Sequence, residues 1–293
     1  MKTLTVFTPT YNRGYCLHQV YESLCSQTSS DFEWLVIDDG STDTTKELVA
    51  GWIAEGTIKI TYYYKENGGM HTGHNSAYEL ITTVLNVCID SDDYMPNTAI
   101  ELILEFWKTH GNEKVAGIVG LDADNNGTII GSKFPANLKQ STLEAIYYKH
   151  KVTGDKKLIL RTEVVKKYPK YPVFEGERFV PLGILYLRID QDYELLCLNK
   201  PLCIVEYLAD GSSKNIFNQY KKNPKGFRYS RIVELTFIKN KREKFKKVLH
   251  LISSTFFIGD FNFFKDNPEK LRTLIFLPFG IFFHLYILYK LKK

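Results

Sequence analysis

The chain has 293 residues, of which 44% are hydrophobic and 24% charged, so it is long enough to bury a full core and too apolar to be disordered throughout. Its five cysteines are odd in number and show no pair at zinc-binding spacing, which argues against a disulfide framework or a zinc ribbon and favours a reducing compartment. The net charge of +5 comes from a basic stretch at residues 214–247. No signal peptide is predicted, because only a short apolar run follows the first three residues, so the N-terminal domain is expected in the cytosol.

Short apolar strands alternate with amphipathic helices over the first 122 residues, a pattern typical of a parallel sheet covered on both faces. Strands are predicted at residues 4–8, 34–38, 58–64, 84–89 and 115–121. Helices are predicted at about 15–26, from 44 onward, at 75–83 and from 96 or 97 to 111. The chain is therefore predicted to be an α/β protein with a mostly parallel, Rossmann-like sheet and helices on both faces.

The alternation breaks after residue 122, where hairpin-like pieces follow, together with helices near 142–150 and 182–189. One α/β domain is expected to cover residues 1–213, with halves at 1–122 and 123–213. Residues 214–293 are expected to form a basic, aromatic-rich helical region. A basic stretch can also bind nucleic acid, but no base-reading motif accompanies this one, so no nucleic-acid partner is predicted.

The last apolar segment, residues 274–289, is shorter than the roughly 20 residues that a membrane-spanning helix needs. An in-plane or re-entrant membrane contact through residues 248–293 is therefore predicted, with the basic C-terminus at an anionic lipid surface. A terminal helix packed on the domain is the alternative.

Polar motifs follow the first two predicted strands, at the sheet edge where open α/β sheets bind ligands. In "TPTYNRGY", Thr8 and Pro9 lead into a turn. There the flat ring of Tyr11 could pack on a nucleobase, and Arg13 provides a positively charged guanidinium group. This stretch could also be an ordinary turn, and it lacks GxGxxG, which argues against a dinucleotide fold. In "VIDDGSTD", one of the paired aspartates could accept a hydrogen bond from a pyrimidine imide and the other hold the loop or a ribose; an Asx turn with a helix cap is the alternative.

Two further motifs follow the third and fourth strands. "KENGGMHTGHNSAYE" combines Lys65, His71 and His74 with an open loop of Asn67, Gly68 and Gly69 ahead of a helix N-terminus, which suits a ribose and diphosphate; structural or exposed histidines are the alternative. "VCIDSDDYMP" gathers three aspartates where a buried strand ends. Side chains at i and i+2 of an extended segment point the same way, so two carboxylates would converge on a hard divalent ion; a structural aspartate turn is the alternative.

Together these four motifs, in this order, resemble the family 2 glycosyltransferases of the GT-A fold over residues 3–122. The resemblance implies that Thr8, Pro9 and Tyr11 line a nucleoside pocket and that Asp39 recognises uracil or thymine. It also implies that Asp90 and Asp92 form an Asp-X-Asp metal motif for Mn²⁺ or Mg²⁺, with Asp92 or Asp93 touching the ion.

The resemblance further implies inverting transfer of a sugar from a UDP- or dTDP-linked donor to an acceptor hydroxyl, which a carboxylate deprotonates. The base is expected in "VFEGERFVP", where Glu177 is favoured, Glu175 is second, and Asp190 or Asp192 are further candidates; a solvated loop is the alternative. By position, residues 206–215 resemble a segment that closes over the diphosphate and the acceptor, with candidates Asp210, Ser212, Ser213 and Lys214; a simple exit turn is the alternative.

The predicted function is therefore a metal-dependent glycosyltransferase at the inner face of the membrane. Its acceptor would be a glycan or a lipid-linked glycan, as in bacterial surface polysaccharide synthesis. A non-catalytic scaffold that binds sugar nucleotides or the membrane, or a sugar-phosphate nucleotidyltransferase, are the alternatives.

Overall fold

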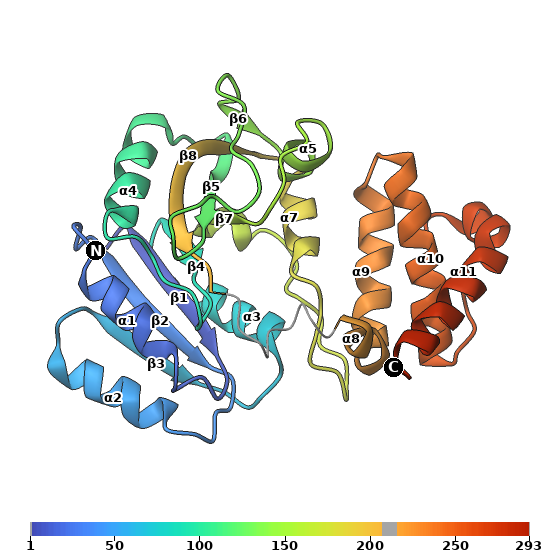
Figure 1. Cartoon of the computed structure of the whole chain (residues 1–293), viewed down its shortest axis with the longest axis horizontal. Coiled ribbons are helices and arrows are strands. Elements are labelled where there is room, and N and C mark those ends of the chain that lie inside the picture. The colour runs from blue at the N-terminus through green and yellow to red at the C-terminus, as the bar shows by residue number, and fades with distance from the viewer. Residues whose placement is uncertain (1, 207–215, 293) are drawn as a thin grey trace. The chain divides into compact units, whose positions relative to one another are not determined.

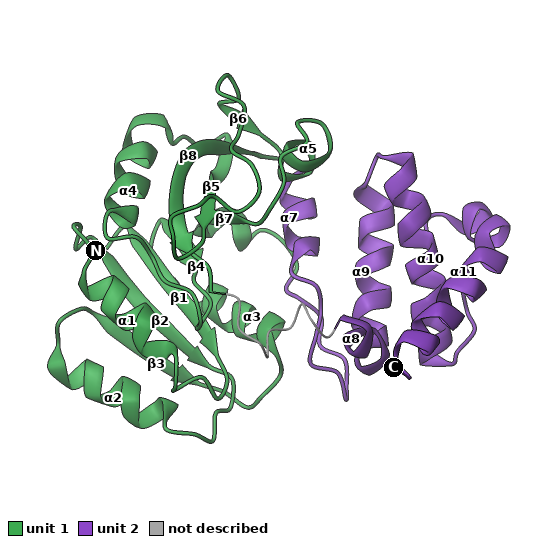
Figure 2. Cartoon of the chain, in the orientation of Figure 1, with its two compact units in different colours: residues 1–169, 192–208 green, residues 170–191, 209–293 purple. Residues whose placement is uncertain are grey.

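The computed structural model describes residues 2–206 and 216–292 and divides the chain into two compact units (Figures 1 and 2). Unit 1 comprises Met1–Pro169 and Asp192–Leu208, and unit 2 comprises Lys170–Gln191 and Ala209–Lys293. The segment with the predicted base therefore clusters with the C-terminal helices. The functional division at residue 213 stays a prediction, because compactness alone does not show which residues act together.

Unit 1 is built on an eight-stranded mixed sheet in the order β3-β2-β1-β4-β7-β5-β8-β6. The strands are β1 (Leu4–Thr10), β2 (Phe32–Asp38), β3 (Ile60–Tyr64), β4 (Leu85–Cys88), β5 (Val115–Ala123), β6 (Gln140–Ser141), β7 (Lys156–Arg161) and β8 (Glu194–Ile204). β3, β2, β1 and β4 pair in parallel, whereas β7 runs antiparallel to β4 and β5. The five predicted strands and the predicted α/β class are confirmed.

Helices cover both faces of this sheet. They are α1 (Leu17–Cys25), α2 (Thr45–Glu55), α3 (Met70–Leu80), α4 (Ala99–His110), α5 (Leu143–Tyr148) and α6 (Thr162–Val165). Successive strand residues point to opposite faces. On β1, Val6 packs in the core that α1 and α4 share, whereas Phe7 contacts His74 and Tyr78 of α3.

Helix α3 begins five residues before its predicted start at Asn75. Gly69 takes a left-handed conformation, φ 90°, and ends the loop, so the helix starts at the next residue. His71 and His74 are buried and face the sheet. These polar residues occupy positions on the buried face of the helix, where the helical pattern expects hydrophobic residues. The sequence pattern therefore did not show the first turn and a half of the helix.

Unit 2 is helical, with α7 (Gly183–Ile189), α8 (Ile216–Lys222), α9 (Pro224–Phe237), α10 (Lys241–Ile258) and α11 (Lys270–Lys290). Asn240 caps α10, because its side chain accepts hydrogen bonds from the N–H groups of Arg242 and Glu243. Glu234 of α9 pairs with Arg231 and with Lys247 of α10, which joins the two helices by a half-buried ion-pair network.

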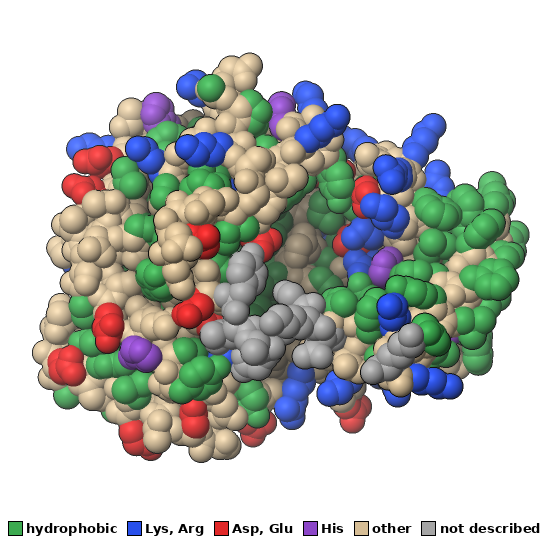
Figure 3. All heavy atoms as spheres, in the orientation of Figure 1, with side chains coloured by type: hydrophobic (Ala, Val, Ile, Leu, Met, Phe, Trp, Pro, Cys, Tyr) green, Lys and Arg blue, Asp and Glu red, His purple; other side chains and the backbone are tan. Residues whose placement is uncertain are grey.

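Helix α11 has 21 residues and continues through Pro278. Its length of about 32 Å is enough to cross the hydrocarbon core of a bilayer. The prediction that this segment is too short was wrong, because the helix begins four residues earlier than the apolar run. Gly280 faces Ile252 of α10, and His284 contacts Ser253, so one face of α11 is packed. The other face exposes apolar side chains, which gather over α11 in Figure 3: Leu271, Leu274, Ile275, Phe279, Phe282 and Leu285.

Candidate active site

The predicted motifs meet at one edge of the sheet in unit 1. Strand register places Thr10 beside Asp38, and Asp38 beside Tyr64, at the carboxyl ends of β1, β2 and β3. The loops after these three strands are therefore neighbours. The residues that follow β4 lie at the same edge, because β4 runs parallel to β1.

Asp38 and Asp39 hold this edge together through different contacts. Asp38 is fully buried, and its carboxylate accepts hydrogen bonds from the Ser41 N–H at 2.7 Å and from the Tyr62 hydroxyl. Asp39 accepts from the N–H groups of Gly68 and Gly69, at 3.0 and 2.7 Å, and pairs with Lys65. The second motif thus shapes the Asn-Gly-Gly loop of the third.

Gly40 shows why a glycine follows the two aspartates. Its φ of +87° is a left-handed conformation, and a Cβ atom there would lie 2.8 Å from the Asn67 nitrogen. A larger residue would push the two loops apart.

Three buried polar atoms in β1, in the loop after β3 and in α3 have no hydrogen-bond partner among the described residues. They are Thr10 Oγ1, Asn67 Oδ1 and His71 Nε2. Buried polar atoms almost always have a partner, so these three mark a place where a polar ligand fits. Burial lowers the pKa of His71 to about 4, against the opposing effect of Asp39, so its imidazole is neutral at physiological pH. Thr10 was not selected from the sequence, because nothing in its neighbours distinguishes it from a core position, whereas His71 belongs to the third predicted motif.

The first loop is arranged differently from the sequence-based expectation at one residue. Thr8 is buried, and its hydroxyl accepts a hydrogen bond from the Trp34 indole, so its side chain belongs to the core. Pro9 is also buried, and Tyr11 is 45% exposed just beyond the strand. The Arg13 guanidinium lies over the Tyr15 ring.

Asn12 joins the first loop to the second, a role that the sequence did not reveal. Its N–H donates to the Ser41 hydroxyl, and its side-chain oxygen accepts from the Thr42 N–H at 2.8 Å. Its φ of 52° is left-handed, which asparagine tolerates better than most residues. An asparagine in a turn after a strand was the available signal.

The three aspartates of "DSDD" separate into two kinds. Asp90 and Asp92 are half-buried, whereas Asp93 is buried. Asp93 accepts a hydrogen bond from the Glu206 N–H, lies 3.6 Å from the Cys203 sulfur, and faces Lys157. Burial raises the pKa of Asp93 to about 7, which Lys157 opposes.

The described residues contain no group of three or more His, Cys, Asp or Glu side chains arranged to hold a metal ion. Two hard carboxylate donors, from Asp90 and Asp92, nevertheless fit Mg²⁺ or Mn²⁺, because these ions accept ligand oxygens from water and phosphate at their other positions. Asp93, which was predicted as a further ligand, faces protein groups.

The predicted base segment lies in unit 2. Glu177 accepts hydrogen bonds through both carboxylate oxygens, from the N–H groups of Lys225 and Gly226, each at 2.8 Å, at the start of α9. Glu175 is exposed. Of the further candidates, Asp192 accepts from the Tyr168 hydroxyl, and Asp190 is the C-cap of α7. The candidates Asp210, Ser212, Ser213 and Lys214 lie outside the described residues.

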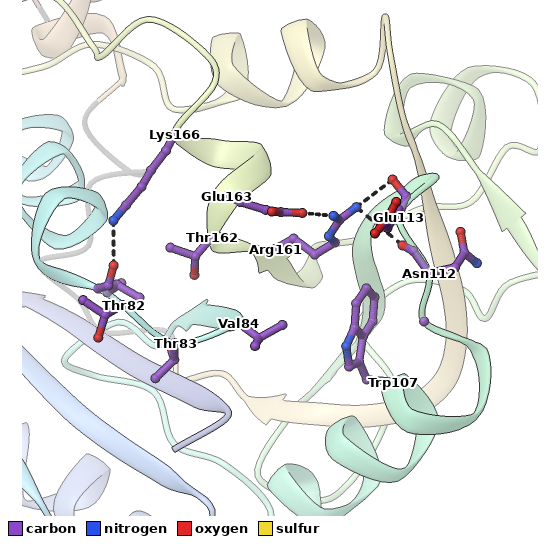
Figure 4. Close-up of a pocket in the computed structure, with 12 residues that line it drawn as sticks. Thr82, Thr83, Val84, Trp107, Asn112, Glu113, Arg161, Thr162, Glu163 and Lys166 are labelled. Carbon is purple, nitrogen blue, oxygen red and sulfur yellow. Dashed lines mark hydrogen bonds and ion pairs between the residues drawn. The ribbon is translucent and has the colours of Figure 1, made fainter. Parts of the chain in front are cut away.

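A cavity of about 510 Å³ lies at the opposite edge of the sheet in unit 1 (Figure 4). It is lined by residues that precede β4 and β5 and by the end of β7, including Thr83, Trp107 and Arg161. Arg161 donates to the carbonyls of Glu113 and Val115, and Lys166 to that of Ile81. None of the unpartnered buried atoms found in the described residues belongs to this lining. Its charged groups therefore serve the fold, and the motif edge is the candidate active site.

Comparisons with known proteins show the family of this chain. The profile of a family described as "Glycosyl transferase family 2" matches residues 5–168. Poly(ribitol-phosphate) beta-N-acetylglucosaminyltransferase TarP of Staphylococcus aureus (strain N315) is 27% identical over 124 residues, which are 42% of this chain and 38% of TarP. A chondroitin synthase of Escherichia coli is 25% identical over 149 residues, which are 50% of this chain and 22% of that protein. The matched region thus spans well under half of either curated relative.

Solved structures show the same fold. S. aureus TarS 1-349 in complex with UDP-GlcNAc has a TM-score of 0.62 and 19% identity, over 87% of this chain and 73% of that one. The mannosyltransferase PcManGT from Pyrobaculum calidifontis, in complex with GDP-Man and Mn²⁺, has a TM-score of 0.56 and 15% identity, over 87% of this chain and 74% of that one.

Proposed function

The chain belongs to glycosyl transferase family 2, and from that premise we propose that it transfers a sugar, with inversion, from a UDP- or dTDP-linked donor to a hydroxyl of a glycan or lipid-linked acceptor. The observation that carries this proposal is the set of unpartnered buried atoms, Thr10 Oγ1, Asn67 Oδ1 and His71 Nε2, at the edge where the four motifs meet. A pyrimidine and a ribose supply the donors and acceptors that these atoms lack.

In this proposal the nucleoside lies between Tyr11 and the loops of Asp39 and Asn67. Asp39 already accepts two backbone hydrogen bonds and forms an ion pair with Lys65. A carboxylate has about four acceptor sites, so it can also accept a hydrogen bond from the imide N–H of uracil or thymine. Its first task is to hold the Asn-Gly-Gly loop open to the ribose. Lys65 and Arg13 supply positive charge for the diphosphate.

Asp90 and Asp92 would hold a Mn²⁺ or Mg²⁺ ion. Bound there, the ion would neutralise the charge of the departing nucleoside diphosphate, so that no protein acid is needed. The complex of PcManGT with Mn²⁺ supports this part of the proposal by analogy of fold.

We propose Glu175 as the base that deprotonates the acceptor hydroxyl. Glu177, which the sequence favoured, has both oxygens engaged at the start of α9, and this supports a positioning role for it. Glu175 is exposed two residues away and makes no hydrogen bond or ion pair with any described residue.

The acceptor is proposed to belong to bacterial surface polysaccharide synthesis at the cytoplasmic face of the membrane. The names of TarP and of the chondroitin synthase support a polysaccharide acceptor. Helix α11 is long and apolar enough to cross a bilayer, and its exposed apolar face, followed by lysines, suits lipid contact.

The test is to incubate the full chain with Mn²⁺ and a panel of nucleotide sugars and to measure free nucleoside diphosphate with and without glycan acceptors. We expect release from a UDP- or dTDP-sugar, lost in chelator and in Asp92→Asn. Glu105→Gln, an exposed carboxylate on α4, is the matched control and should behave as wild type. Pyrophosphate release instead would indicate a nucleotidyltransferase, and binding without turnover a scaffold.

A further inference from the structure

Lys157 on β7 lies among the acidic side chains of the active-site edge. β7 runs antiparallel to β4 and β5, so its first residues lie where those two strands end. The Lys157 side chain is only 12% exposed, and its Nζ is 3.8 Å from Asp93 Oδ2. Asp122, near the end of β5, is also buried, and its Oδ1 has no hydrogen-bond partner among the described residues.

The charges around Lys157 keep it ionised. Burial opposes its positive charge, but the surrounding carboxylates of Asp122, Asp93 and Asp90 raise its pKa above the usual value. In the other direction, a buried carboxylate such as Asp93 is costly unless a cation lies beside it. Lys157 is therefore a fixed positive charge in a cluster of carboxylates that would otherwise repel one another.

Asp93 is bound to protein groups on each side that the structure describes. Its Oδ1 accepts from the Glu206 N–H, and its Oδ2 faces both the Cys203 thiol and Lys157. These contacts keep its oxygens among protein groups, whereas Asp90 and Asp92 remain half-exposed.

We propose that Lys157 is a positioning residue of the donor site: an internal counter-ion that keeps Asp93 out of metal coordination and leaves Asp90 and Asp92 for the divalent ion. The inference rests on the proposed function for its metal part. In this proposal Asp93 acts electrostatically, whereas the sequence suggested that it is a ligand of the metal ion.

The proposal makes opposite predictions for the two members of the pair. Lys157→Met removes a positive charge near the metal site, so Mn²⁺ should bind several-fold more tightly. Asp93→Asn leaves the lysine uncompensated, so Mn²⁺ should bind several-fold more weakly although Asp93 does not touch it. In Lys157→Met/Asp93→Asn both charges are gone, and the affinity should return to within about twofold of wild type.

The experiment measures Mn²⁺ binding to the full chain by electron paramagnetic resonance, without nucleotide or sugar, in these variants and in Lys157→Arg. Lys157→Arg keeps the charge and should bind as wild type. If Asp93 were a ligand, the double variant would bind at least tenfold more weakly than wild type, which would overturn the proposal. Equal affinity in all variants would overturn it as well.

Urea unfolding of the same variants separates this proposal from the metal proposal. Each single substitution should lower the unfolding midpoint, and the double variant should lose much less than the sum of the two. If the wild-type protein binds no Mn²⁺, the proposed metal dependence is wrong, and only the unfolding midpoints of the variants test the counter-ion role. A loss in the double variant that is much smaller than the sum of the two single losses supports that role, and a loss equal to the sum overturns it. If Lys157→Met does not fold, the neutral double variant must still fold and match wild type.

Discussion

Glu177 gives the sharpest quantitative prediction, because its carboxylate closes the N-terminus of α9 from a distant part of the sequence. Its two oxygens accept the N–H groups of Lys225 and Gly226, both at 2.8 Å, in the first turn of a 14-residue helix that starts with Pro224. In return, the Asn223 side chain accepts the Arg178 N–H at 2.8 Å. The arrangement is equivalent to a helix cap supplied by a separate segment.

Glu177→Ala leaves both of these N–H groups without their side-chain acceptor. Loss of a cap costs about 1–2 kcal/mol, and loss of a negative charge at a helix N-terminus costs up to about 1 kcal/mol more. The free energy of unfolding should therefore fall by about 1–3 kcal/mol. For a protein of this size that corresponds to a Tm lower by about 2–10 °C. Glu177→Gln keeps one oxygen acceptor and should lose about half as much.

The measurement is thermal and urea unfolding followed by circular dichroism, with Glu175→Ala as the matched control. Glu175 is exposed in the same loop, so its substitution should change stability by less than about 0.5 kcal/mol. Activity should show the reverse order, with Glu175→Gln losing kcat at unchanged Tm. Equal stability of Glu177→Ala and wild type would refute the capping argument, and full activity of Glu175→Gln would refute the proposed base.

Three further outcomes are expected. Asn67→Ala and His71→Ala should each weaken UDP binding about tenfold in calorimetry, since a good polar contact contributes about 1–2 kcal/mol; unchanged affinity would place the nucleoside elsewhere. The depressed pKa of about 4 for His71 means that its contribution to stability is complete above pH 6.5 and is lost as the pH falls toward 4. In His71→Gln the free energy of unfolding should therefore depend less on pH between 6.5 and 4. An unchanged pH dependence would contradict a buried neutral ring. Replacing exposed Leu274 and Phe282 of α11 by Gln should reduce sedimentation with anionic vesicles at unchanged Tm; equal vesicle binding would argue against lipid contact through this face.

Much of the fold could be predicted because it depends on local patterns. The apolar strands at the start of unit 1 alternate with helices, and the polar motifs follow the strands in the order that the sheet brings together. The start of α3 could not be placed, because His71 and His74 are polar residues on the buried side of a helix.

The site's internal contacts were harder to predict, because they join residues that are distant in sequence. Asp93 stood out in its motif, but nothing local shows that β7 brings Lys157 to the end of β4. The same holds for Glu177 and α9, since the sequence around "EGERF" shows a free carboxylate and not the helix that it caps. Asn12 and its contacts with the second loop were missed for the same reason.

The most direct test of the central claim is a crystal structure of the full chain with UDP and Mn²⁺, in which the anomalous signal locates the ion. We expect one Mn²⁺ beside Asp90 or Asp92 at about 2.2 Å from a carboxylate oxygen, the diphosphate on the same ion, and the uracil near Asn67 and His71, with Asp93 still facing Lys157. An ion bound elsewhere, or UDP lodged away from the loops after β1, β2 and β3, would contradict it.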